Sequence, residues 1–224
     1  MPTPLPIRTG DRAPDFALPT VNREGAVSLG DYHGRPLLLG LYRGLHCPFC
    51  RRHLAQLDLT REKLTGLGVE TLAVVNTPVT AARLYFKHRP TRVLLASDPE
   101  SATHRSYTLA MPAIVEGERR HEAWPVESTM QDWTAVRINP TGDLPEALPP
   151  FDALTALNAR DGYEVSEADQ QVIARVGTQL VGHFLIDAGG VVRWSYREAE
   201  SGPAGVGRFP REDDILAAAR AVAG

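Results

Sequence analysis

A run of apolar residues ends five positions before the only two cysteines of the chain. The run PLLLGLY occupies residues 36–42, and Cys47 and Cys50 follow it at a spacing of three. Turn-forming residues flank the run, which is typical of a buried strand. Beyond the cysteines, apolar side chains recur at the spacing of one helix face as far as Leu64, and Gly66 then ends the pattern. The sequence therefore predicts a strand that turns directly into a helix at Cys-x-x-Cys.

The other apolar runs predict a sheet built with two kinds of connection. Helical patterns separate the first three predicted strands, which favours right-handed crossovers and parallel pairing. The last two strands flank Ala188-Gly189-Gly190, a hairpin turn signature. After the first helix, the predicted strands are 69–76, 92–98, 180–187 and 191–196, and the predicted helices are 79–88, 100–109 and a last one that begins at 210. The fold class is therefore α/β, with a central mixed sheet flanked by helices.

One segment is too long to be an ordinary connection. The chain has 224 residues, of which 43% are apolar, so it can bury one substantial core, and we expect a single domain over residues 1–224. Residues 112–176 are rich in proline, yet they contain helix-like stretches at 151–158 and 166–176. A loop without structure of its own is seldom this long. We therefore expect a helical and loop insertion at 112–176, before the final strand–strand–helix unit.

Charge and hydropathy exclude several classes of partner. The formal net charge is −3 at pH 7, and the basic residues are scattered. Even the clusters Arg51-Arg52 and Arg119-Arg120 are interpreted as solvated faces, so we expect neither nucleic acid nor a membrane surface as a partner. The first residues carry proline and charge where a secretory signal needs an apolar stretch, and no apolar run reaches bilayer length. These features predict a cytoplasmic protein.

In a reducing compartment, two closely spaced thiols indicate a catalytic, redox-sensing or metal-binding pair. A metal site is the sharper alternative to a redox pair, because His46, Cys47, Cys50 and His53 supply four zinc-type ligands within eight residues. Structural zinc sites usually collect their ligands from two segments, and four ligands from one helix start would not readily surround an ion. The favoured interpretation is a redox pair that needs no metal ion and no cofactor.

The predicted helix start gives Cys47 the surroundings of a thiolate. Cys47 falls at the N-cap and Pro48 at the first helical position, so the sulfur faces unpaired amides and the positive end of the helix dipole. Arg43, and His46 when protonated, would favour the thiolate further. Cys50 lies one turn further on, along the apolar face, where we expect it to be shielded from solvent.

These positions predict a role for each cysteine. Cys47 attacks a peroxide or a disulfide, and Cys50 then attacks the sulfenate or mixed disulfide to form an intramolecular disulfide. An external thiol reductant of the thioredoxin or glutathione type would restore the dithiol. In the alternative function, the same pair senses oxidation and the insertion passes the signal to a protein partner, without catalytic turnover.

Four separate segments carry a wider resemblance. They are GDRAPDFALP, VSLGDYHGRPLLLGLYR, VLLASDPESATHRSY and HFLIDAGGVVRW. In this order they resemble the peroxiredoxin-like branch of the thioredoxin superfamily, the alkyl hydroperoxide reductase and thiol-specific antioxidant type. The resemblance implies a thioredoxin-like fold, antioxidant reduction of hydroperoxides and a peroxidatic cysteine at Cys47. The protein could form a homodimer, and the sequence leaves its oligomeric state open.

Other active-site positions depart from the pattern of that family. Typical peroxiredoxins place a proline seven residues and a threonine or serine three residues before the cysteine, where this chain has Gly40 and Gly44. The family's arginine before the late strand would fall near Val181. These differences remove hydrogen-bond donors to the peroxide oxygens, and Arg43 is the candidate to replace them.

Two residues of the predicted strand at 180–187 are candidate supporting residues. In thioredoxin folds the loop before this strand approaches the helix start, which would bring Gly182 and His183 across from the thiols. A histidine that enters a strand is also commonly a structural hydrogen-bonding residue. The predicted site comprises Cys47, Cys50 and Arg43 as catalytic residues, with His46, Pro48, Gly182 and His183 as supporting residues.

Overall fold

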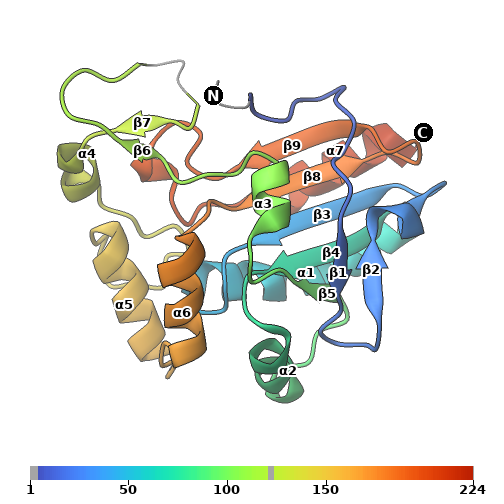
Figure 1. Ribbon diagram of the computed structural model, residues 1–224, viewed down its shortest axis with the longest axis horizontal. Coiled ribbons are helices and arrows are strands. Elements are labelled where there is room, and N and C mark those ends of the chain that lie inside the picture. The colour runs from blue at the N-terminus through green and yellow to red at the C-terminus, as the bar shows by residue number, and fades with distance from the viewer. Residues whose placement is uncertain (1–4, 121–123, 224) are drawn as a thin grey trace.

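A computed structural model describes residues 5–120 and 124–223, and its centre is a five-stranded sheet of order β5-β4-β3-β8-β9 (Figure 1). Strand β3 pairs in parallel with β4, and β4 with β5, whereas β8 is antiparallel to both β3 and β9. The strands are β3 (Leu37–Tyr42), β4 (Glu70–Val75), β5 (Leu94–Ser97), β8 (Gly182–Ile186) and β9 (Val192–Arg197). The predicted mixed sheet, with its crossovers and its final hairpin, is confirmed.

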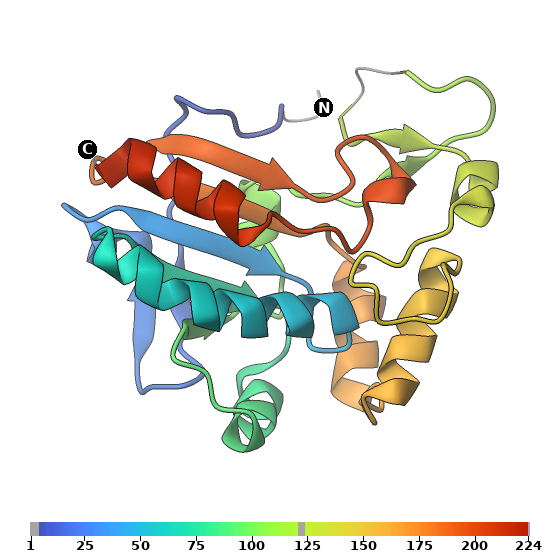
Figure 2. The ribbon, with the colours of Figure 1, turned by 180° about the vertical axis from the view of Figure 1, so that it is seen from behind.

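Helices cover one face of the sheet and a smaller ribbon covers part of the other. Helices α1 (Pro48–Gly66) and α7 (Glu212–Ala223) lie side by side on the face seen in Figure 2. The opposite face carries the antiparallel pair β1 (Ala17–Pro19) and β2 (Ala26–Ser28), the short helix η1 (Leu29–Tyr32) and helix α3 (Ala102–Ser106). Helix α2 (Val79–His88) lies beside the β5 edge.

The side chains of β3 alternate between two apolar cores. Leu37, Leu39 and Leu41 belong to the core under β1 and β2, and Leu38 and Tyr42 belong to the core that contains both cysteines. Every residue of β3 is buried, as expected for a central strand with both faces covered. The side chain of Tyr42, the last residue of the strand, therefore lies on the face of the sheet where α1 packs.

The insertion has local structure of its own and packs where α1 begins. Its elements are β6 (Ala113–Ile114), β7 (Glu127–Ser128), α4 (Met130–Ala135), α5 (Pro150–Arg160) and α6 (Glu167–Val176). Ala153 and Leu157 of α5 join the same apolar core as the cysteines. Reciprocal side-chain and backbone hydrogen bonds at Thr129 and Ser166 begin α4 and α6, as their sequences allow.

One predicted helix is shorter than its sequence pattern. The prediction of a helix over 100–109 was wrong at both ends, since α3 spans only Ala102–Ser106. Ser101 and Thr108 have φ values of 53° and 57°, in the left-handed region that a right-handed helix cannot contain. Within residues 5–120 and 124–223, no helix is long and apolar enough to cross a membrane.

Candidate active site

The two cysteines lie at the first turn of α1, with Cys47 at the N-cap. The backbone amide of Cys50 donates to the sulfur of Cys47 at 3.2 Å, and Pro48 occupies the first helical position. Both side chains are free thiols. The local geometry is therefore the predicted one, in which an amide of the first turn points at the Cys47 sulfur.

A buried arginine faces this sulfur and is held by a buried carboxylate. The Nη1 atom of Arg43 lies 3.7 Å from Cys47 Sγ, and its Nη2 atom donates to Glu198. The backbone amides of Val181 and Gly207 also donate to Glu198, at 3.0 and 2.6 Å. Because Glu198 accepts these hydrogen bonds, Arg43 is fixed between a carboxylate and the sulfur.

These contacts move the pKa values of the two thiols in opposite directions. Burial alone would raise the pKa of Cys47, but the hydrogen bond from the Cys50 thiol and the charge of Arg43 outweigh it and lower the value to about 6. Burial and the interaction with Cys47 raise the pKa of Cys50 well above its ordinary value. These shifts favour the thiolate at Cys47 and keep the proton on Cys50.

Both sulfurs are enclosed in the resting structure. Cys50 is shielded as predicted, with 1% of the residue's surface exposed, but Cys47 is shielded as well, at 0%. Leu45 and Phe49, which flank Cys47 along the chain, are also buried. Any substrate, even one as small as a water molecule, therefore requires some displacement of these neighbours before it can meet the Cys47 sulfur.

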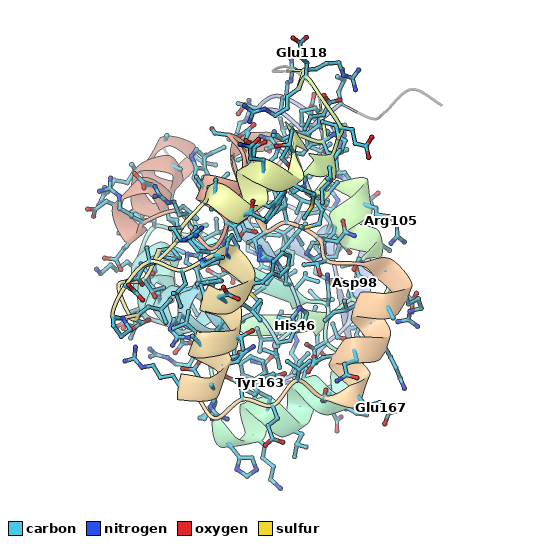
Figure 3. The ribbon with its side chains drawn as sticks, turned by 90° about the vertical axis from the view of Figure 1, so that its left-hand side faces the viewer. His46, Asp98, Arg105, Glu118, Tyr163 and Glu167 are labelled. Atoms are coloured by element: carbon cyan, nitrogen blue, oxygen red, sulfur yellow. The ribbon has the colours of Figure 1, made fainter. Side chains whose placement is uncertain are left out.

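The insertion reaches His46, the residue before Cys47. Asn158 of α5 donates to the backbone oxygen of His46 at 2.9 Å, and Asp169 of α6 lies 3.9 Å from its Nδ1 atom. Figure 3 shows His46 between these two helices. The side chain of His46 thus faces the insertion, while its charge when protonated still favours the Cys47 thiolate, as the sequence predicted.

The interpretation of Arg51-Arg52 as a solvated face was wrong. Arg51 is 9% exposed and donates to the Leu45 backbone oxygen at 2.6 Å and to Asp161 at 2.6 Å. Arg52 donates to both carboxylate oxygens of Asp161 and to Asp143. The residues directly after Cys50 therefore tie the redox motif to the insertion. No local sequence pattern indicates these contacts, because the acidic partners are about ninety to a hundred and ten positions away in the chain.

His183 does not face Cys47 as a partner but belongs to a buried hydrogen-bonded triad. The hydroxyl of Tyr42 lies 2.7 Å from His53 Nδ1 and 2.9 Å from His183 Nε2. His53 Nε2 lies 3.3 Å from the oxygen of Pro210, so it carries the proton, and Tyr42 then donates to His53 and accepts from His183. Burial lowers the pKa of His53 to about 4 and that of His183 well below its ordinary value, which keeps both neutral.

The two glycines that replace the family's proline and threonine make room for other side chains. A Cβ atom on Gly40 would lie 2.6 Å from the ring of Tyr42, and one on Gly44 would lie 2.7 Å from Nδ1 of His46. Gly182 is a packing position too, since a Cβ there would lie 2.7 Å from Leu109. The family's peroxide-binding side chains could therefore not simply be restored here.

The metal-binding alternative lacks the geometry of a site. His46 is directed to Asp169 and His53 to Tyr42, so the two histidines do not converge on the sulfurs. Across residues 5–120 and 124–223, no three His, Cys, Asp or Glu side chains form a group that could hold a metal ion.

Glu198 is the functional candidate that the sequence did not indicate. It follows β9, and its carboxylate is fully buried beside Arg43, which leads from β3 to the cysteines. The only sequence signal is its place at the end of a strand, which in this fold is the sheet edge where α1 also starts.

Comparison with known proteins places the chain among thiol-dependent redox proteins. The profile described as AhpC/TSA family matches residues 9–133, which is more than half of the chain. No curated protein matches.

Several solved structures share the fold. Peroxidoxin BcpB from Mycobacterium tuberculosis is 14% identical with a TM-score of 0.55, over 96% of this chain and 98% of that one. A peroxiredoxin-like protein from Aquifex aeolicus is 14% identical with a TM-score of 0.57, over 98% and 90%. A protein from Chlorobium tepidum assigned as thiol:disulfide interchange protein DsbE is 21% identical with a TM-score of 0.52, over 95% and 99%. At these identities the likeness concerns the fold, which is that of thioredoxin-like peroxiredoxins.

Proposed function

Because the chain belongs to the AhpC/TSA family, we propose that it is a thiol oxidoreductase that cycles between the Cys47, Cys50 dithiol and an intramolecular disulfide. The observation that carries this proposal is the buried contact of Arg43 with the Cys47 sulfur at 3.7 Å, beside a second thiol one turn along the same helix. This arrangement supplies a thiolate nucleophile and a proton-bearing resolving thiol within one helical turn.

Either of two oxidants, a hydroperoxide or a disulfide, can drive the proposed cycle. With a hydroperoxide, the Cys47 thiolate takes the terminal oxygen to become a sulfenic acid, the O–O bond breaks, and the alkoxide leaves with a proton as an alcohol. The Cys50 thiol then displaces water and forms the disulfide. With a disulfide, Cys47 forms a mixed disulfide and releases one thiolate, and Cys50 releases the second. Two equivalents of an external thiol restore the dithiol.

The side chains around Cys47 matter more for the reaction with a hydroperoxide than for the reaction with a disulfide. Peroxide cleavage develops negative charge on the leaving oxygen, and Arg43 is the charged donor beside the sulfur that could stabilise it. Disulfide exchange places its charge on a sulfur and depends less on such donors. The glycines at positions 40 and 44 contribute no side-chain donor to either reaction.

Steady-state turnover tests the proposal. The protein is supplied with a recycling thiol reductant and with hydrogen peroxide, an organic hydroperoxide or a small disulfide. We expect catalytic consumption of at least one oxidant, complete loss of activity in Cys47→Ser, and a trapped sulfenic acid or mixed disulfide in Cys50→Ser, detected by mass spectrometry. Full multiple turnover by Cys50→Ser would overturn the resolving role of Cys50.

The second candidate is a redox sensor, and the contacts of the insertion favour it. Arg51, in the first turn of α1, donates to Asn158 and Asp161, and Asn158 also holds the backbone of His46. Formation of a Cys47–Cys50 disulfide would change the start of α1, to which these residues are tied. A sensor would be oxidised only stoichiometrically in the turnover experiment, and its insertion would change its protection from hydrogen exchange on oxidation.

A further inference from the structure

A hollow of about 540 Å³ opens beside the redox motif, between the start of α1, the insertion and the segment before α7. Phe49, the second residue between the two cysteines, forms part of its wall together with His53, one turn further along α1. Its other side is formed by Pro140 of the insertion and by Phe209, just before α7. We name this hollow the basic pocket. Its volume lies within the range of sites for small organic ligands.

The aromatic residues that line the basic pocket are tightly packed against one another. Phe209 stacks on His53 with ring centroids 4.7 Å apart, and Phe49 and His53 are only 1% and 3% exposed. A Cβ atom on Gly207 would lie 3.0 Å from both Phe49 and Pro140, so the wall closes directly over Phe49. The partly exposed ring of Phe209 is the aromatic surface that this lining offers to an apolar or aromatic ligand body.

The rim of the basic pocket carries positive charge that the protein does not neutralise. Four arginines line it, and two of these are paired, Arg52 with Asp143 and Asp161, and Arg211 with Asp214. The other two, Arg137 and Arg208, are exposed and have no carboxylate partner among the described residues. No described Asp or Glu lines the pocket. In a chain of net charge −3, two uncompensated guanidinium groups at the rim of a pocket favour an anionic ligand.

The wall of the pocket is also connected to the nucleophile. The backbone amide of Gly207 donates to Glu198, and Glu198 holds Arg43 beside Cys47. Phe49 lines the pocket and belongs to the same apolar core as both cysteines. Displacement of Phe49 by a ligand in this pocket would therefore open a path into the core that holds both sulfurs.

We infer that the basic pocket binds the oxidised substrate of the dithiol, and that this substrate is a small organic molecule with an apolar or aromatic body and a carboxylate, which Arg137 and Arg208 bind. The inference rests on the proposed function for the identity of the ligand as a substrate. A carboxylate-bearing hydroperoxide and a carboxylate-bearing disulfide share the required chemistry, and each would react through the balanced steps given above.

Two pairs of oxidants, each a neutral compound and a carboxylate-bearing one, distinguish a hydroperoxide substrate from a disulfide substrate. Cumene hydroperoxide is compared with 4-(2-hydroperoxypropan-2-yl)benzoate, which adds a carboxylate to the same body. Neutral 4,4′-dithiodipyridine is compared with 5,5′-dithiobis(2-nitrobenzoate), which carries two carboxylates. If the substrate is a hydroperoxide, KM should be lower for the carboxylate-bearing hydroperoxide than for cumene hydroperoxide. If it is a disulfide, KM should be lower for the carboxylate-bearing disulfide than for the neutral one. In either case we expect 1 M NaCl to reduce the difference in KM.

The variants Arg137→Gln and Arg208→Gln test where the carboxylate binds. Each should raise KM for the anionic oxidant about tenfold, the loss expected for one charge-assisted hydrogen bond, and should change KM for its neutral partner much less. Arg23→Gln is the matched control, because it removes the same charge from an exposed arginine in the turn between β1 and β2, on the opposite face of the sheet. An equal effect of Arg23→Gln, or the same KM for both members of each pair, would overturn the inference and leave the proposed function intact.

Binding of an unreactive probe tests the pocket without turnover. Calorimetric titration with 4-isopropylbenzoate should show binding to the reduced protein that Arg137→Gln and Arg208→Gln weaken and Arg23→Gln does not. No turnover with any oxidant, together with this pattern of binding, would reject the proposed function but not the anion site. Absence of binding at millimolar probe would reject the site.

Discussion

The Nη1 atom of Arg43 lies 3.7 Å from the sulfur of Cys47, and both side chains are buried. Little solvent remains to screen this contact, so the guanidinium acts on the thiolate in surroundings of low polarity. Glu198 completes the arrangement, because it fixes the guanidinium but also opposes the thiolate by its own negative charge. Changes to Arg43 and to Glu198 should therefore move the pKa of Cys47 in opposite directions.

Replacement of Arg43 by glutamine should raise the pKa of Cys47 from about 6 toward its ordinary value, because the largest nearby positive charge is removed. Thiolate absorbance near 240 nm, followed against pH in the reduced protein, measures the change. Since Arg43→Gln leaves Glu198 buried without its partner, the double variant Arg43→Gln, Glu198→Gln guards against loss of folding. Arg193→Gln, on the β8–β9 hairpin, is the control. An unchanged pKa in both Arg43 variants would contradict the role assigned to this residue.

Replacement of Glu198 by glutamine should lower the pKa of Cys47 below about 6, because the carboxylate raises it. The amide has one oxygen where the carboxylate has two, so either Val181 or Gly207 loses an acceptor, and we expect a loss of about 1–3 kcal/mol in the free energy of unfolding. The same absorbance titration and urea unfolding measure the two effects. A rise in the pKa would mean that Arg43 leaves the sulfur once Glu198 no longer holds it.

The reduced protein should gain stability from Cys47 at high pH. The pKa of Cys47 is depressed in the folded state, so this contribution is fully present above the ordinary thiol value near 9 and disappears as pH falls through about 6. Comparison with Cys47→Ser by urea unfolding under reducing conditions, at pH 5.5 and pH 9, isolates the effect. The advantage of the wild type should grow toward pH 9, by at most about 4 kcal/mol. An advantage that is equal at both pH values would contradict the depressed pKa.

Replacement of Asp161 by asparagine should loosen the insertion from the redox motif. Asp161 accepts hydrogen bonds from both Arg51 and Arg52 and is partly exposed, so we expect a loss of about 1–2 kcal/mol in the free energy of unfolding. Alkylation of Cys47 by iodoacetamide should become faster, because Arg51 also holds the backbone of Leu45, just before the motif. Asp152→Asn, an exposed change on α5, is the control and should leave both quantities unchanged.

Replacement of Tyr42 by phenylalanine should destabilise the protein and leave the thiolate intact. The hydroxyl of Tyr42 is the shared partner of His53 and His183, and its removal leaves polar nitrogens buried, at a cost of about 1–3 kcal/mol. Tyr196→Phe, whose hydroxyl bonds only to the Arg208 backbone oxygen, is the control. A shift in the pKa of Cys47 caused by Tyr42→Phe alone would show that the triad acts on the nucleophile, contrary to this prediction.

The sequence by itself determined the local part of the site. The buried strand before Cys47, the proline at the first helical position and the three-residue spacing to Cys50 are enough to fix an N-cap sulfur, because these interactions join residues within one turn of each other. The order of strands and helices likewise determined the mixed sheet, since crossover handedness and the hairpin turn leave few alternatives.

Only the tertiary structure decided what surrounds that sulfur. Glu198, Asp161 and Asn158 are far from the cysteines in the chain, and they meet the motif only because the sheet edge and the insertion converge there. The same convergence buries Cys47 and places His183 with Tyr42, which no local pattern could indicate. Contacts of this kind depend on how distant elements pack, so the thiolate's charge partners and its access route had to come from the fold.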